Sequence, residues 1–241
     1  MNRAGTVLAM LYASALGGAA AAAEPVQPAE PVLTPFAAHF DAQWKGINVG
    51  SSEIELKADT EPGQFVYVWS IAARGIFKVA YNHPVNQSSW FSVQNGHAQP
   101  HKYLGEDGSA SVSLDFDWNK RVITGMSENK PVNIPIKTGA QDLNSIQVEV
   151  MLDLQSGDLP KTFEIIDKDQ LKEFNYTREG TARIRTEVGM LDTIVVASQR
   201  TGNTRILRMW FAPSLGFMPV QAERWRDGKL EFAMRIKSYK R

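Results

Sequence analysis

Apolar and more polar residues alternate along most of the chain from residue 36 onward. In the first such segment, 36–44, every second residue is apolar, which is the period of a half-buried β-strand. Comparable segments follow at 47–57, 64–74, 86–93, 109–118, 121–128, 161–167, 171–178, 181–188, 192–200, 205–212, 218–226 and 229–239. Asp227-Gly228, between the last two, is a strong hairpin signal because a type I′ turn needs positive φ angles. The pattern predicts an antiparallel meander.

The segment 142–155 has a helical period instead. Asp142 can cap the start of this helix and Gly157 can end it. The apolar residues of the segment are Leu143, Ile146, Val148, Val150, Met151, Leu152 and Leu154. Because they cover much of the helix circumference, we expect the helix to be buried in the mouth of a curved sheet. A shorter helical turn is expected around 76–81. The predicted fold is therefore mainly β: a large curved antiparallel sheet, a half-barrel or partly closed barrel, with one helix packed on its concave side.

Three strands are apolar on both faces: 65–69, 193–197 and 209–212. Either their second face is covered by the helix or by another sheet, or it lines an apolar cavity. A curved sheet with a helix in its mouth is a common way to enclose an apolar molecule. If there is such a cavity, the predicted wall residues are Trp69, Met151, Trp210 and Phe211.

The first 35 residues predict export. Arg3 is followed by an apolar or small-residue stretch from 6 to 20, and three alanines end at Ala23, which is typical of a signal peptide cleaved after that residue. Residues 24–35 contain four prolines and are expected to form a disordered linker. Residues 36–241 then form a single β-rich domain. We expect the mature protein in the periplasm, with secretion as the alternative.

Composition excludes several classes of function. The chain has no cysteine, so it has no disulfide, thiol nucleophile or thiolate metal site. Its 26 basic and 26 acidic residues balance, whereas nucleic-acid-binding proteins usually carry a basic excess. No apolar stretch after the leader is long enough to predict a transmembrane segment in the mature chain.

Candidate chemistry is sparse, and no catalytic residue, metal site or cofactor is expected. His97 and His101 have the spacing of a helical metal pair, but Pro100 lies between them in a segment that is not helical. Asp115 and Asp117 share one face of a strand at roughly 6.5–7 Å. That separation suits an inverting glycosidase, but catalytic carboxyls need different surroundings, so a solvated polar face is favoured.

Four arginines in the C-terminal half lie in pairs on strand faces: Arg183 with Arg185 and Arg224 with Arg226. If neighbouring strands align, these pairs form a basic stripe that could bind anionic lipid headgroups. The alternative is cross-strand pairing with the acidic residues Glu187, Glu223 and Glu231.

A set of short motifs occurs in an order that resembles a known family. They are the leader, Phe36-x-x-x-Phe40 followed by Gly46 and Gly50, Trp90 before Gly96, Asp142-Leu-Asn-Ser145, Arg205-Ile-Leu-Arg-Met-Trp210, and Gly216-Phe-Met-Pro219-Val220. The order resembles the bacterial exported family catalogued as domain of unknown function 3108. The resemblance implies a periplasmic, mostly antiparallel β protein without an established activity, and it implies no catalytic residues. The family's usual first-strand tyrosine is Phe40 here.

Three hypotheses of function follow. The leading one is non-enzymatic binding of a lipid or another apolar envelope molecule. The second is an interaction protein of envelope assembly, with a filled core, no small ligand and an envelope protein as its partner. The third is a hydrolase of envelope polymers that uses Asp115 or Asp117.

Overall fold

A computed structural model describes residues 31–80, 83–108, 110–159 and 162–241. The predicted signal peptide and the first part of the predicted linker lie outside these residues. Residues 31–35 have no regular secondary structure, but Leu33 is buried in the main core. The backbone N–H of Val32 donates a hydrogen bond to Oε1 of Gln155 at 3.0 Å. Val32 and Leu33 thus already contact the β-rich domain. No helix within the described ranges is long and apolar enough to cross a membrane.

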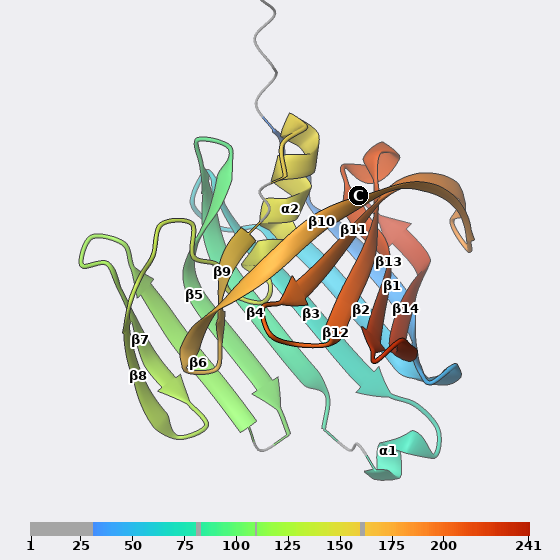
Figure 1. Cartoon of the computed structure of the whole chain (residues 1–241), viewed down its shortest axis with the longest axis horizontal. Coiled ribbons are helices and arrows are strands. Elements are labelled where there is room, and N and C mark those ends of the chain that lie inside the picture. Colours follow the sequence, from blue (N-terminus) through green and yellow to red (C-terminus); the bar gives the residue numbers. More distant parts are fainter. Residues whose placement is uncertain (1–30, 81–82, 109, 160–161) are drawn as a thin grey trace, which may run out of the picture.

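In the described residues the fold is one antiparallel sheet of fourteen strands (Figure 1). The first eight are β1 (Phe36–Trp44), β2 (Ile47–Ala58), β3 (Gln64–Ala73), β4 (Val85–Gln94), β5 (His97–Asp107), β6 (Ala110–Asp117), β7 (Val122–Ser127) and β8 (Lys130–Pro135). The others are β9 (Thr162–Asp167), β10 (Gln170–Thr186), β11 (Gly189–Arg200), β12 (Arg205–Ala212), β13 (Met218–Arg226) and β14 (Lys229–Lys240). The helical elements are α1 (Phe77–Ala80), α2 (Ser145–Ser156) and the 3₁₀ turn η1 (Pro213–Leu215).

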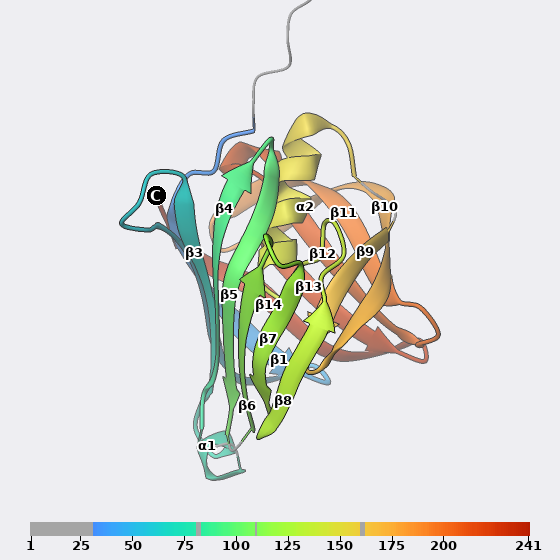
Figure 2. The ribbon, with the colours of Figure 1, turned by 90° about the vertical axis from the view of Figure 1, so that its left-hand side faces the viewer.

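The strand order explains where the main helix lies. The strand order in the sheet is β8-β7-β6-β5-β4-β3-β2-β1-β14-β13-β12-β11-β10-β9. The chain therefore begins in the middle of the sheet, at β1, and adds neighbouring strands in sequence until β8 forms one edge. The chain then crosses to the opposite edge, at β9, and adds strands toward the middle until β14 pairs with β1. Helix α2 belongs to this crossing and lies on the concave side, between β4 and β5 on one side and β10 and β11 on the other (Figure 2). The predicted fold class is confirmed, and the sheet is not closed.

Two apolar clusters fill the concave side. The larger one packs α2 against strands from both limbs of the sheet and includes Leu56, Tyr67, Phe91, Leu152 and Phe211. The smaller one joins β5–β8 to β9 and contains Tyr103, Leu114, Phe116, Ile123, Val132, Ile136, Ala140 and Ile166. Between the two edges, Gln141 makes an isolated parallel bridge with Ile165. Hydrophobic burial thus holds the two limbs together around the helix.

The sequence analysis did not predict strands β5 and β8, and each of them contains proline. In β5, Pro100 lies beside a bulge where Lys102 pairs with Trp90 and Pro100 with Phe91. Strand β8 contains Pro131 and forms an edge of the sheet. Proline cannot donate to a strand ladder, and these are the two places, bulges and edges, where a sheet tolerates it.

The sequence also predicted two strands, 171–178 and 181–188, where the structure has one. Strand β10 continues through Glu179 and Gly180, and its pairing with β11 shifts between Arg178 and Gly180. Gly180 has a φ of 134°, which only glycine adopts without strain. The residues that suggested a turn therefore form a bulge, which bends the strand without ending it.

Candidate functional site at helix α2

The start of α2 is fixed by a buried carboxyl group. Oδ1 of Asp142 accepts hydrogen bonds from the backbone N–H groups of Asn144 and Ser145, each at 2.8 Å. Its Oδ2 accepts a hydrogen bond from Oγ of Ser89 on β4 at 2.6 Å. Asp142 therefore accepts from backbone N–H groups at the start of the helix, as a cap would, although the helix begins at Ser145, three residues later than predicted, and Asn144 is its N-cap residue. At the other end, Gly157 is left-handed, with φ 80°, and its N–H donates to the carbonyl of Asp153, as a C-terminal cap should.

Burial raises the pKa of Asp142 to about 6, while the hydrogen bonds from Ser89, Ser145 and Asn144 favour the charged form and limit the rise. Each of the two carboxylate oxygens has a donor. This group has a structural task, which is to tie the first turn of α2 to β4.

A second polar group lies on the side of α2 that faces β5. Glu149 and Asp153 are one helical turn apart, so they share a face, and both are buried. Oε2 of Glu149 accepts a hydrogen bond from the backbone N–H of Ala98 at 2.6 Å, and Nε2 of Gln141 donates to the carbonyl of Ala98 at 2.8 Å. Strand β6 pairs with β5 only from Lys102 onward, so these side chains satisfy the backbone groups of Ala98 on the side of β5 that faces away from β4.

His97 completes a three-residue cluster with these two acids. Its Nδ1 lies 2.8 Å from Oε1 of Glu149 and 4.0 Å from Oδ1 of Asp153. One ligand atom from each of the three residues lies within 4.8 Å of the other two. The His97 side chain is 63% exposed, whereas those of Glu149 and Asp153 are 7% and 5% exposed. The cluster is therefore buried on the helix side and open to solvent on the histidine side.

The charges of the cluster perturb one another. The hydrogen bond to Glu149 raises the pKa of His97 above its ordinary value. Burial raises the pKa of Asp153 to about 8, and the neighbouring charge of Glu149 adds to the rise. Oδ2 of Asp153 is buried without a hydrogen-bond partner among the described residues. This carboxyl therefore lacks the structural partners that Asp142 and Glu149 have.

A hollow opens beside the C-terminal end of α2, between the helix and the concave face of β10. Its volume is about 610 Å³. Leu154 and Leu159 contribute from the helix side, and Tyr176 and Arg178 from β10. The remaining lining residues are Gly157, Asp158, Asn175 and Thr177. The hollow thus combines a buried apolar floor with one positive and one negative side chain at its rim.

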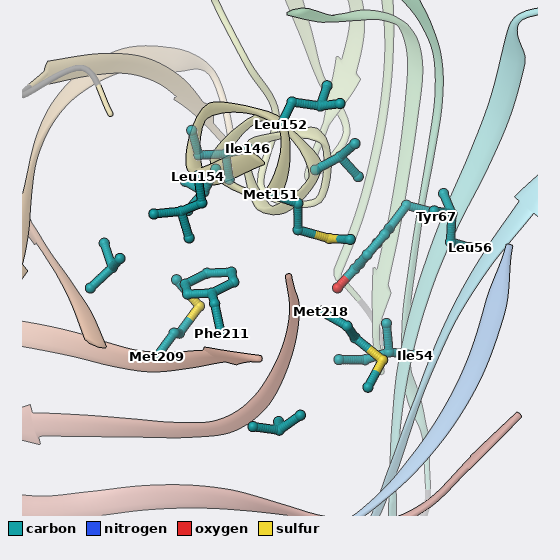
Figure 3. Packing of buried hydrophobic residues seen from close by; sticks show 14 of the residues in the cluster. Ile54, Leu56, Tyr67, Ile146, Met151, Leu152, Leu154, Met209, Phe211 and Met218 are labelled. Atoms are coloured by element: carbon teal, nitrogen blue, oxygen red, sulfur yellow. The ribbon is translucent and has the colours of Figure 1, made fainter. Parts of the chain in front are cut away.

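The four predicted wall residues are placed in different surroundings. Figure 3 shows Met151 pointing from α2 toward Tyr67 on β3, with Phe211 and Met209 of β12 below the helix. Met151 and Phe211 are buried in the main cluster, and Trp69 and Trp210 pack against it half-buried. Trp210 and Phe211 are consecutive on β12, so their side chains leave opposite faces of the sheet. None of the four lines the hollow beside α2, and their ligand contact stays a prediction.

The four predicted arginines do not form one stripe. Arg183 pairs with Asp192 of β11, whereas Arg224 pairs with Leu207, which itself pairs with Ser198 of β11. The two arginine pairs are thus offset by six residues along β11, about 20 Å. Arg224 and Arg226 lie 3.4 and 3.1 Å from carboxylate oxygens of Glu231. For this pair the structure has the cross-strand arrangement that the sequence left as an alternative.

The other candidate residues are also separated. His101 contacts Oγ of Ser92 at 3.0 Å, while His97 faces helix α2, so the two histidines make no common site. Asp115 is exposed on the outer face of β6. Its neighbour Asp117 accepts a hydrogen bond from the backbone N–H of Lys120, which lowers the pKa of Asp117. A general acid needs a raised pKa, whereas that of Asp117 is lowered.

Sequence reasoning missed the acidic residues of the cluster, although a signal was present. The helix was expected to be buried because apolar residues cover so much of its circumference. Any acid within such a helix must then be buried too, and Glu149 and Asp153 are spaced to share a face. The part played by His97 could not be found in this way, because it comes from a strand about fifty residues earlier.

An open antiparallel half-barrel around helix α2 defines the class of this protein. The model of the family described as "Protein of unknown function (DUF3108)" matches residues 39–231, and the chain belongs to this family. The resemblance found in the motif order is thereby confirmed. Among curated proteins, none matches the sequence.

Two solved structures are similar over most of their length. One is a candidate exported protein with a YmcC-like fold from Bacteroides fragilis NCTC 9343, at 9% identity and a TM-score of 0.37, covering 88% of this chain and 98% of that one. The other is a candidate lipoprotein from Parabacteroides distasonis ATCC 8503, at 10% identity and a TM-score of 0.33, covering 87% and 97%. At these TM-scores the two proteins carry no functional information about this chain.

Proposed function

We propose that this protein binds a lipid or another apolar envelope molecule in the periplasm and catalyses no reaction. The observation that carries the proposal is the hollow of about 610 Å³ between α2 and the concave face of β10. Pockets for small molecules usually measure about 300–1,000 Å³ and have mostly apolar walls with a few polar groups. The predicted leader of residues 1–23 supports the periplasmic location.

The hollow leads from solvent toward the main core. Leu154 follows Met151 by one turn on the same apolar face of α2, so the helix side of the hollow continues the face on which the sequence placed a cavity wall. On the sheet side, Tyr176 is buried and Arg178 pairs with the buried Val196. An acyl chain would pack against Leu154, Leu159 and Tyr176.

Arg178 gives the hollow a preference for an anionic end group. Arg178 is one of the lining residues, and the fork of N–H donors on an arginine suits carboxylates and phosphates. This role differs from the headgroup contact predicted for Arg183 and Arg185, which lie further along the same strand, beyond the bulge. The ligand class that fits best is therefore an amphipathic molecule with an apolar chain and a negative head.

The test starts from protein exported with its own leader and purified without detergent. Native mass spectrometry and solvent extraction should reveal a stoichiometric adduct of lipid mass on a chain that begins at Glu24. Arg178→Ala and Leu159→Asp should lower its occupancy severalfold, because they remove the cation and place a charge on an apolar wall.

Arg185→Ala is the matched control, because it removes an arginine from the same strand outside the hollow. Trp210→Ala and Met151→Ala test the wall predicted from sequence. If the measured mass is that of the protein alone and stays unchanged after incubation with envelope lipids, lipid binding is contradicted. That result would favour an interaction protein with a filled core. Loss of the adduct in Arg185→Ala but not in Arg178→Ala would contradict the assignment to this hollow.

A further inference from the structure

We propose that His97, Glu149 and Asp153 form a binding site for a divalent transition-metal cation of the Zn²⁺ type. This site is separate from the hollow: its acids lie on the side of α2 that faces β5, whereas the hollow opens toward β10. It needs no enzymatic activity and does not depend on the lipid.

The distances suit one small cation. Zn²⁺ binds histidine nitrogen and carboxylate oxygen at about 2.0–2.2 Å, so two ligand atoms of one ion can lie up to about 4.2 Å apart. Nδ1 of His97 is 2.8 Å from Oε1 of Glu149 and 4.0 Å from Oδ1 of Asp153. The three atoms lie within 4.8 Å of one another, so a small side-chain movement brings all of them into reach.

A second observation separates this cluster from an ordinary group of acids. Asp153 is 4% exposed, and its Oδ2 has no hydrogen-bond partner within the described ranges. A buried carboxyl without donors is costly, so the fold must gain something from it or lose stability. The nearest charged groups are the cluster's own, Glu149 and His97, together with Asp158, which acts on both His97 and Asp153. A cation at this point would supply the missing partner.

The arrangement around the ligands is that of a prepared site. The backbone N–H of Ala98 holds Oε2 of Glu149 at 2.6 Å, which orients Oε1 toward His97. Such outer contacts fix ligand orientation in metal sites. The exposed side of His97 leaves room for a water molecule as a further ligand. Imidazole with carboxylates favours Zn²⁺ over Mg²⁺ and Ca²⁺, which prefer sites made of oxygen only.

A bound cation would join two parts of the fold. His97 follows the two-residue turn Asn95-Gly96 that connects β4 to β5, and the acids belong to the crossing helix. The site therefore ties the end of a hairpin to α2 next to the entry of the N-terminal segment, where Pro31 lies near Gly96. We infer that the ion stabilises this end of the half-barrel.

The experiment uses the mature chain stripped with chelator and titrated with Zn²⁺ alone, by calorimetry and by thermal unfolding. One equivalent per chain should bind and raise the unfolding temperature. His97→Gln and Asp153→Asn should each weaken binding at least tenfold and abolish the temperature shift. His97→Gln changes an exposed side chain, so it keeps the test valid if Asp153→Asn disturbs the helix.

His101→Gln is the matched control, because His101 lies on the same strand as His97 but forms its hydrogen bond with Ser92 and is not part of the cluster. It should bind Zn²⁺ as the wild type does. The proposal is overturned if no saturable binding occurs, if His101→Gln weakens binding as much as His97→Gln, or if Asp153→Asn binds unchanged. Equal or tighter binding of Ca²⁺ or Mg²⁺ would overturn the assignment to a transition metal.

Discussion

Two buried aspartates lie along helix α2, and their surroundings differ. Asp142, before the first turn, accepts three hydrogen bonds, from the hydroxyl of Ser89 and from two backbone N–H groups. Asp153, near the last turn, has a buried Oδ2 with no partner in the described part of the chain. Both carboxyls have a raised pKa, and in both cases burial is the main cause.

The number of hydrogen-bond donors separates a structural carboxyl from a candidate binding group. Burial and a raised pKa are common to both residues, so neither property identifies a site. The number of donors that the fold supplies does distinguish them, because a buried polar group without partners costs free energy that something else must offset. Asp142 is explained by its contacts at the start of helix α2, whereas Asp153 has no such donors, and the proposed cation would supply the missing partner.

The largest effect is expected from Asp142→Ala. The substitution leaves the two N–H groups and the hydroxyl of Ser89 without an acceptor, and each unpaired buried donor costs about 1–3 kcal/mol. We expect the free energy of unfolding to fall by about 4 kcal/mol in urea denaturation. Asp115→Ala, on the outer face of β6, is the control and should change it by less than about 0.5 kcal/mol. If the two variants lowered the free energy of unfolding equally, the structural role assigned to Asp142 would be contradicted.

A pH series sharpens the same assignment. The folded state raises the pKa of Asp142 from 3.8 to about 6, so between these values the folded protein binds more protons than the unfolded chain. Stability due to this group is therefore present below pH 4 and is lost as the pH rises through 6, by about 3 kcal/mol. The difference in unfolding free energy between wild type and Asp142→Asn should follow this curve. A pH-independent difference would show that folding leaves the pKa of Asp142 unchanged.

A smaller effect is expected on the other side of the comparison. Asp153→Asn replaces a carboxyl group whose buried Oδ2 has no donor to lose, so the metal-free protein should change in unfolding free energy by less than about 1 kcal/mol. Glu149→Ala is the matched variant and should cost about 1–3 kcal/mol, because the N–H of Ala98 loses its acceptor. If Asp153→Asn lowers the free energy of unfolding more than Glu149→Ala does, Asp153 has a structural partner. The contrast between Asp153 and Asp142 would then be wrong.

The smallest effect on stability is expected at the hollow. Arg178→Ala removes an exposed side chain, so the free energy of unfolding should change by less than about 0.5 kcal/mol while ligand occupancy falls. Chemical denaturation and native mass spectrometry on the same preparation check both statements. A large loss of stability would mean that Arg178 supports the fold, and the binding result would then need another variant.

Elements with a clear period were predictable, and elements whose pattern depends on distant partners were not. The strand from Phe36 and the helix ended by Gly157 follow from local alternation and capping. Strand β5 was missed because Pro100 contradicts a strand locally, and only the pairing with β4 shows that it lies beside a bulge. The sequence prediction also divided strand β10 near Gly180, because a glycine suggests a turn locally and only the pairing with β11 shows a bulge.

The candidate site was less predictable than the fold. Met151 and Phe211 were chosen as apolar, and they are buried as apolar residues usually are. The hollow beside α2 instead brings together Leu154 and Arg178, whose positions depend on how the crossing helix packs against β10. The basic stripe required Arg183 and Arg224 to align, and the register of β11 with its two neighbours decides against this.

By itself, the sequence determined the β-rich fold class, the single capped helix and the family, because these depend on local periodicity, turn residues and the order of motifs. Only the tertiary structure decided that His97 meets Glu149 and Asp153, and that Asp142 reaches Ser89. These contacts join segments about fifty residues apart. They form because the chain crosses from one edge of the sheet to the other, and a local pattern contains no information about that crossing.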